Sequence, residues 1–167
     1  MSRTADGPWP KLCRRKNRPR GSLTVIYFDS THVARLYLED HGWESVRELA
    51  KRSSIACSMH GRSEVVDALH RKHRDGVFSA DEYRQVLDQF ELDCHENAFH
   101  WLPLSPQVMT RVVAVYRHLP STVFLRSVHA LHLACAAENR FHEIYSNDSR
   151  LLGAAPHFGI TGVNVIP

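Results

Sequence analysis

Hydrophobic residues form short continuous runs at several points along the chain. Leu23–Phe28 is a nearly unbroken apolar and β-branched run that ends at Asp29, a pattern typical of a parallel strand buried on both faces. Shorter runs predict further strands. Pro103 assigns one of them to a sheet edge, because proline cannot donate a ladder hydrogen bond. These further strands are predicted at residues 55–57, 101–104, 144–145 and 163–166.

Between these runs, apolar residues recur at the three- and four-residue spacing of amphipathic helices. Ser79 and Glu82 have the spacing of a capping box, and Ser105 with Pro106 marks another helix start. The predicted order is three successive strand–helix–helix units followed by one strand–helix–strand unit. This order predicts an α/β three-layer fold, with a mainly parallel central sheet of about four to five strands flanked by helices.

The apolar stripes of the predicted helices also indicate which side chains are buried. The helix that begins at Ser105 is expected to turn a hydrophobic face toward the core, and Phe90 on the preceding helix is expected to be buried as well. The predicted buried face after Ser105 consists of Val108, Met109, Val112, Val113 and Tyr116.

The composition is that of a globular protein with a single core. The 167 residues are 43% hydrophobic and 23% charged, which excludes a wholly disordered chain. No stretch approaches the roughly 20 uncharged apolar residues of a membrane helix, and the first residues lack the apolar block of a signal peptide. We therefore expect a cytoplasmic protein with no membrane partner. The four cysteines are widely spaced and are expected to be reduced thiols.

The positive charge of the chain is concentrated at its start. Residues 1–22 contain seven Lys or Arg and one acid, whereas the remainder contains 14 basic and 17 acidic residues. We therefore expect a basic, disordered leader at residues 1–22 and a folded domain at residues 23–167. The leader could contact the phosphates of RNA, but a solvated tail is the simpler interpretation.

Acidic residues follow two of the predicted strands. Asp29 comes after the first strand and Asp148 after the fourth, while Glu64 opens the helix after the second. The carboxyl ends of parallel strands meet at one edge of a sheet, so these acids are expected to face a common crevice. The alternative for the two aspartates is helix capping, and for Glu64 a solvated surface position.

Other motifs in the sequence allow different interpretations. Arg126 and His132 have the R-x5-H spacing of an all-helical ribonuclease family, but the predicted strands argue against that fold. The residues after the first strand resemble a phosphatase nucleophile loop, yet the second acid of that loop is absent. Two histidine pairs at i, i+3 spacing, His70 with His73 and His129 with His132, could bind a metal or be ordinary polar residues.

Four segments together resemble the successive motifs of PIN-domain ribonucleases, and most closely the toxin subunits of VapBC-type toxin–antitoxin pairs. The resemblance extends over about residues 24–166 and leaves out the basic leader. The segments are VIYFDST at 25–31, Ser58 ahead of EVVDAL at 64–69, LRSVHALHLA at 125–134 and IYSNDSRL at 144–151.

The resemblance implies a PIN-like domain with metal-dependent endoribonuclease activity. It assigns Asp29, Glu64 and Asp148 as catalytic carboxylates that hold Mg²⁺ or Mn²⁺, with Thr31, His129 and Asn147 in support. Hard cations of this kind bind carboxylate oxygens and activate water for phosphodiester cleavage. The implied partners are an RNA substrate, a cognate antitoxin and a second copy of the chain.

Residue 129 departs from the family pattern, because His stands where an acid is expected. An imidazole subtracts one negative charge from the site and favours Mn²⁺ or a later transition metal over Mg²⁺. A second function class therefore stays open, a PIN-like module that binds RNA or an antitoxin without efficient cleavage.

Overall fold

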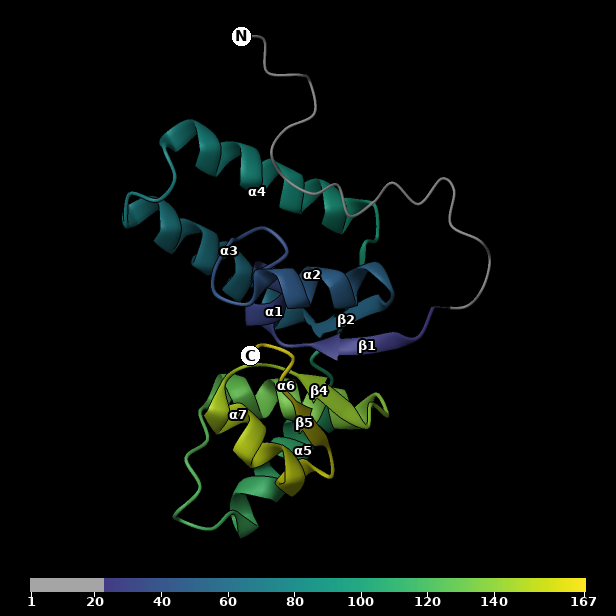
Figure 1. Ribbon diagram of the computed structural model, residues 1–167. Helices are drawn as coiled ribbons and strands as arrows, with labels where there is room; N and C mark the ends of the chain where they lie inside the picture. Colours follow the sequence, from purple (N-terminus) through teal and green to yellow (C-terminus); the bar gives the residue numbers. More distant parts are fainter. Residues whose placement is uncertain (1–22) are drawn as a thin grey trace, which may run out of the picture.

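A computed structural model describes residues 23–167, in which five strands form one sheet (Figure 1). The strand order is β3-β2-β1-β4-β5, and every neighbouring pair is parallel. The strands are β1 Val25–Phe28, β2 Ser54–Ser58, β3 Phe99–Leu102, β4 Glu143–Tyr145 and β5 Thr161–Val163. The α/β class and the mainly parallel sheet predicted from the sequence are therefore confirmed, and β3 lies at the predicted edge.

Helices connect the strands in the predicted order. Two helices follow each of the first three strands, one helix and a 3-10 turn follow the fourth, and β5 is last. The helices are α1 Ser30–Ala34, α2 Trp43–Lys51, α3 Met59–Arg74, α4 Ala80–His95, α5 Pro106–His118, α6 Ser127–Glu138 and α7 Ser149–Ala154, and the 3-10 turn is η2 Ala155–Phe158. The capping box at Ser79 and Glu82 is present, and Pro106 occupies the first turn of α5.

The sheet separates two hydrophobic cores. Helices α1 to α4 cover one face, and α5, α6 and α7 cover the other (Figure 1). Successive residues of a strand point to opposite faces, so Phe28 packs in the first core and Tyr27 in the second. Both side chains are fully buried. Burial on both faces explains why the first strand reads as an unbroken apolar run.

Two sequence predictions about the hydrophobic pattern were wrong in detail. The last strand ends at Val163, whereas the run at residues 163–166 predicted a strand. The run continues past the strand because Ile166 is buried against the first core. On α5, Val108 is buried, but Met109, Val113 and Tyr116 are exposed and do not belong to the core. An apolar helical stripe is equally compatible with burial against another chain.

Cysteine burial agrees with the expected reduced thiols within the described part of the chain. Cys57 and Cys135 are buried, Cys94 is half-buried, and all three are free. Cys13 and the predicted leader at residues 1–22 lie outside the described residues. No helix within residues 23–167 is both long enough and apolar enough to cross a bilayer.

Two glycines provide a matched test of the fold. Gly42 precedes α2 with a φ of 79°, and a Cβ atom there would collide with the side chain of Ile166. We expect Gly42→Ala to lower the free energy of unfolding by roughly 2–3 kcal/mol, through left-handed strain and overpacking. Gly153, which lies in α7, has open space around its Cα. Gly153→Ala should be neutral or raise stability by about 0.5–1 kcal/mol.

Urea denaturation of both variants measures these changes. Equal stability of Gly42→Ala and the wild type would contradict the contact between α2 and the segment after β5.

Candidate functional site

Asp29 lies at the carboxyl end of β1 and is almost fully buried, with 2% of its surface exposed. Its carboxylate accepts hydrogen bonds from Thr31 Oγ1 at 2.8 Å, the His32 backbone N–H at 2.9 Å and the Ser146 hydroxyl. The bond from His32 makes Asp29 the N-cap of α1. The capping alternative from the sequence is thus correct for this residue, and it is compatible with a role in a site.

The charge of Asp29 is maintained by its neighbours. Burial alone would raise its pKa, but interactions with His32 and the Ser146 hydroxyl outweigh burial and hold the pKa well below its usual range. His32 Nδ1 lies 3.4 Å from Asp29 Oδ1, and the His32 side chain is fully buried. Asp29 is therefore an anion at every physiological pH.

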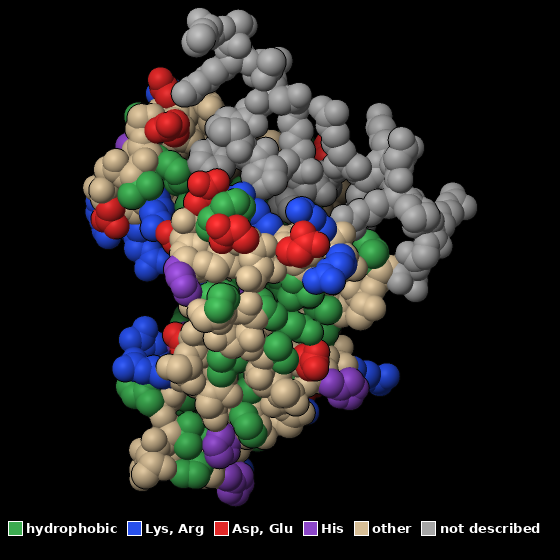
Figure 2. Space-filling view, viewed as in Figure 1, with side chains coloured by type: hydrophobic (Ala, Val, Ile, Leu, Met, Phe, Trp, Pro, Cys, Tyr) green, Lys and Arg blue, Asp and Glu red, His purple; other side chains and the backbone are tan. Residues whose placement is uncertain are grey.

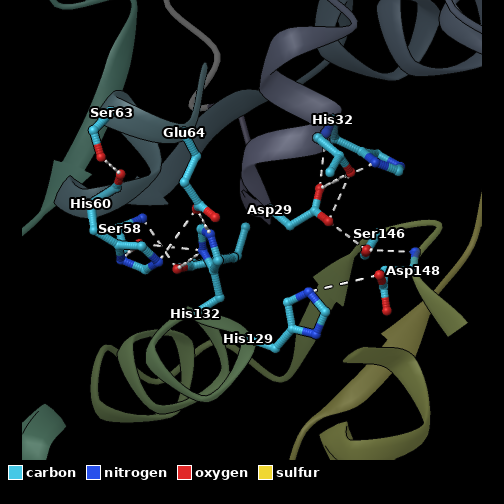
Figure 3. A network of polar contacts seen from close by, with 12 residues as sticks. Asp29, His32, Ser58, His60, Ser63, Glu64, His129, His132, Ser146 and Asp148 are labelled. Atoms are coloured by element: carbon cyan, nitrogen blue, oxygen red, sulfur yellow. Dashed lines mark hydrogen bonds and ion pairs between the residues drawn. The ribbon is translucent and has the colours of Figure 1, made fainter. Parts of the chain in front are cut away.

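Asp148 begins α7, three residues beyond the end of β4. Its Oδ1 atom accepts from the backbone N–H groups of Arg150 and Leu151, each at 2.9 Å, so Asp148 is also an N-cap. The Asp148 backbone N–H donates to Ser146 Oγ at 3.0 Å, and the same hydroxyl donates to Asp29. Ser146 thus joins the two aspartates at the ends of adjacent strands (Figure 3).

The three residues predicted to support the acids lie beside them. His129, near the start of α6, has its Nε2 atom 3.7 Å from Asp148 Oδ2. Thr31 Oγ1 also lies 3.4 Å from the Asn147 side-chain oxygen, at the distance limit of a hydrogen bond. The imidazole of His129 therefore stands next to the Asp148 oxygen that does not cap α7.

Glu64 is half-buried in the second turn of α3 and contacts two histidines. Its Oε2 atom lies 2.8 Å from His132 Nε2 and 3.4 Å from His60 Nε2. Burial raises the pKa of Glu64, but the hydrogen bond with His132 and the charge interactions with both histidines lower it overall. Burial and the neighbouring His132 lower the pKa of His60 to about 4, so His60 is neutral near pH 7. We call His60, Glu64 and His132 the imidazole cluster.

The predicted site residues form two groups at the carboxyl edge of the sheet (Figure 3). Asp29 and Asp148 are connected through Ser146, whereas Glu64 belongs to the imidazole cluster. Among residues 23–167, the imidazole cluster is the set of three side chains whose potential ligand atoms all lie within 4.8 Å of one another. The three carboxylates do not form such a set.

Sequence reasoning missed Ser146 and His60 and assigned His132 to other pairings. Ser146 is fully buried, and its role depends on the adjacency of β1 and β4, which no local pattern encodes. The i, i+4 spacing of His60 and Glu64 on one helix face was a local signal that could have found this pair. His132 joins them from α6, 68 residues farther along the chain than Glu64.

A cavity of about 420 Å³ opens beside Asp148, and Thr31, which donates to Asp29, also lines it. Its polar lining combines two acids, Asp40 and Asp148, with two arginines, Arg35 and Arg71, and Asn147 lies beside Asp148. Figure 2 shows Lys and Arg side chains on both sides of a hollow at the left edge of the molecule. A larger cavity of about 550 Å³ lies along α5, where the acid in its lining, Glu138, is paired with Arg111. Of these two cavities, the smaller one therefore adjoins the candidate site, at Asp148.

Comparison with known proteins gives structural matches only. No family model and no curated protein matches the sequence. The fold is similar to FitAcB from Neisseria gonorrhoeae, with a TM-score of 0.68, 11% identity, and coverage of 83% of this chain and 96% of that one. VapBC2 from Rickettsia felis, solved bound to a DNA fragment from its promoter, gives a TM-score of 0.60 at 12% identity, covering 84% and 98%.

A toxin–antitoxin complex from Klebsiella pneumoniae gives a TM-score of 0.56 at 16% identity, covering 83% of this chain and 95% of that one. The TM-scores of 0.56 to 0.68 show a shared fold, and at such low identities they show the fold alone. The five-stranded parallel sheet with helices on both faces is accordingly the PIN-like fold that the sequence motifs led us to expect.

Proposed function

We propose that this protein is a metal-dependent endoribonuclease and the toxin component of a toxin–antitoxin pair. The observation that carries the proposal is the pair of aspartates at the ends of β1 and β4, joined by Ser146 beside a cavity lined with arginines. The similarity of the fold to chains of toxin–antitoxin complexes supports the same conclusion. RNA as the substrate makes the cytoplasm the site of action.

The donor set suits a hard divalent cation. Asp29 is ionised, Glu64 has a lowered pKa, and Asp148 has one oxygen that does not cap α7. The resemblance assigns these three carboxylates to Mg²⁺ or Mn²⁺. Such cations bind oxygen ligands and retain several waters, so the ion would contact Asp148 and Asp29 and reach the more distant Glu64 through a bound water. When bound, the cation activates water and stabilises the charge that builds on the phosphoryl oxygens.

The protein's own side chains position the acids and the substrate. His32 and Ser146 keep Asp29 ionised, Thr31 donates a further hydrogen bond that orients its carboxylate, and Asn147 adjoins Thr31. Arg35 and Arg71 line the cavity next to Asp148. Arg35 donates to the backbone carbonyls of Thr31 and His41, and Arg71 pairs with Asp67, so both are held at the cavity, where their positive charge would attract a phosphodiester. The substrate backbone would therefore run through this cavity, with the scissile phosphate toward Asp148.

His129 favours a second candidate function. Its imidazole lies 3.7 Å from Asp148 in the position where the resemblance expects an acid, so the site has one anion fewer for a cation. A site weakened in this way would leave a PIN-like module that binds RNA or the antitoxin without efficient cleavage.

Two protein partners belong to the proposal. An antitoxin would insert a basic side chain among the acids, where Asp148 and Glu64 are partly accessible. A second copy of this chain would cover the apolar face of α5 and the segment after it, which leaves Met109, Val113, Tyr116 and Phe124 exposed. A homodimer buries this face and explains its departure from the predicted core.

Asp29→Asn tests the nuclease proposal directly. Asparagine can still cap α1 but lacks the charge, so we expect cleavage of a mixed RNA substrate with Mg²⁺ or Mn²⁺ to fall at least ~100-fold. Asp81→Asn, an exposed acid of α4 with 79% of its side chain accessible, is the matched control and should cleave normally. Cleavage that persists in Asp29→Asn and in the presence of EDTA would overturn the metal mechanism.

His129→Asp distinguishes the two candidate functions. Restoring an acid next to Asp148 adds a negative charge, so Mg²⁺-dependent cleavage should increase relative to the wild type, while His142→Asp, at an exposed position, should change nothing. Gel analysis of RNA cleavage with each metal measures this change. A gain in His129→Asp over an inactive wild type supports the weakened module, whereas strong Mg²⁺-dependent cleavage by the wild type supports the nuclease.

The dimer is tested by charge placed on the α5 face. Val113 has 56% of its surface exposed, and Val77, in the loop between α3 and α4, has 60%. We expect wild type and Val77→Glu to have twice the mass of one chain by light scattering, and Val113→Glu to have the mass of one chain, because burying an unpaired carboxylate is costly. A monomeric wild type at micromolar concentration would exclude the dimer.

A further inference from the structure

Two imidazole nitrogens and one carboxylate oxygen converge in the imidazole cluster. His132 Nε2 lies 2.8 Å and His60 Nε2 3.4 Å from the same atom, Glu64 Oε2. The two rings are close, with centroids 4.3 Å apart. His60 and Glu64 are one turn apart on α3, and His132 approaches from α6, so two separate helices supply the three side chains.

Hydroxyl groups fix the orientation of both rings. His132 Nδ1 lies 3.0 Å from the Tyr27 hydroxyl, which in turn accepts the Ser58 backbone N–H at 3.1 Å. His60 Nδ1 lies 2.7 Å from Ser58 Oγ. With the Nδ1 atoms engaged in this way, both Nε2 atoms are directed at Glu64. Histidines that bind metals are typically held by such a hydrogen bond at the second ring nitrogen.

His60 Nε2 is an independent indication of a missing partner. This atom is buried and has no hydrogen-bond partner within residues 23–167, although it faces the Glu64 carboxylate. Buried polar atoms are almost always satisfied, so an unsatisfied one requires a specific explanation. Glu64 Oε2 shares a hydrogen bond with His132 Nε2, whereas its 3.4 Å contact with His60 Nε2 does not make one. A cation between the three atoms would satisfy all of them.

The backbone of α3 is adapted to the approach of His132. A Cβ atom on Gly61 would lie 3.2 Å from His132 Cε1 and 2.6 Å from Cys57 Sγ, closer than ordinary van der Waals contact. The absence of a side chain at position 61 therefore lets the ring lie against the first turn of the helix that carries His60 and Glu64.

We infer that His60, Glu64 and His132 bind a divalent transition-metal ion of the Zn²⁺ class, with a coordination position open to water. Neighbouring ligand atoms around tetrahedral zinc, at bond lengths of about 2.0–2.1 Å, are about 3.3 Å apart. The separations of 2.8 and 3.4 Å from Glu64 Oε2 are close to this value, and all three potential ligand atoms lie within 4.8 Å of one another. Two imidazoles favour Zn²⁺ over Mg²⁺, which prefers oxygen ligands.

This site does not depend on the nuclease activity proposed above, although Glu64 would be shared between the two. The full chain without an affinity tag is titrated with Zn²⁺ against a chromophoric chelator, and Co²⁺ serves as a spectroscopic probe. We expect one ion per chain and a visible Co²⁺ spectrum typical of nitrogen and oxygen ligands. His60→Ala should weaken Zn²⁺ binding roughly tenfold or more.

Two controls separate this site from its surroundings. His70→Ala removes an exposed histidine of the same helix and should bind Zn²⁺ as the wild type does. Asp29→Asn removes the acid at the centre of the proposed nuclease site and should also leave Zn²⁺ affinity unchanged. Circular dichroism confirms that each variant is folded, and His60→Gln replaces His60→Ala if the latter is not.

Two results of the Zn²⁺ titrations would contradict metal binding by the imidazole cluster. Equal Zn²⁺ affinity of the wild type and the folded His60 variant would overturn the inference, as would loss of binding in Asp29→Asn with retention in the His60 variant. The second result would assign the ion to the acids instead. RNA cleavage is not part of this readout, so an inactive nuclease leaves the test intact.

Discussion

The hydroxyl of Ser146 is the interaction on which the edge of the sheet depends. It donates to the buried carboxylate of Asp29 and accepts the backbone N–H of Asp148, so it connects the ends of β1 and β4. A buried carboxylate is tolerated only when donors compensate for lost hydration. Because Thr31 and the start of α1 supply the remaining donors, the charge of Asp29 connects the junction of β1 and α1 to the distant segment after β4.

Each acid of the edge also has its own imidazole. His32 adjoins Asp29, His132 adjoins Glu64, and His129 adjoins Asp148. A neighbouring imidazole can stabilise an anion without the permanent charge of lysine or arginine. The edge therefore keeps its negative character, and its cations of fixed charge, Arg35 and Arg71, lie in the adjoining cavity.

The sequence was sufficient for the fold because local signals agree with one another. The unbroken run before Asp29, the capping box at Ser79 and the proline at position 106 all lie where the structure has a strand end or a helix start. The burial of α5 could not be predicted, since a hydrophobic stripe looks the same whether it faces a core or a solvent-exposed surface. The predicted length of the last strand was wrong for a similar reason, because Ile166 is hydrophobic and buried but lies beyond the end of β5.

The candidate site was predictable only in part. The strand-end positions of Asp29 and Asp148 follow from topology, and the helical position of Glu64 follows from the motif. Their partners do not, because Ser146 and His132 reach the acids through contacts between segments 117 and 68 residues apart. Contacts between side chains that are distant in sequence produce no helical or strand periodicity from which they could be predicted.

The two aspartates cap helices as well as providing charge, and this double role affects how such sequences are read. A descendant that lost all chemistry would still benefit from Asp29 at α1 and Asp148 at α7, since removing a cap costs about 1 kcal/mol. Their presence in a related chain is thus weak evidence of activity. Position 129 lies inside α6 and caps nothing. No capping requirement constrains the residue type at position 129. Whether a related chain has an acid or a histidine there is therefore more informative about activity than the presence of the two aspartates.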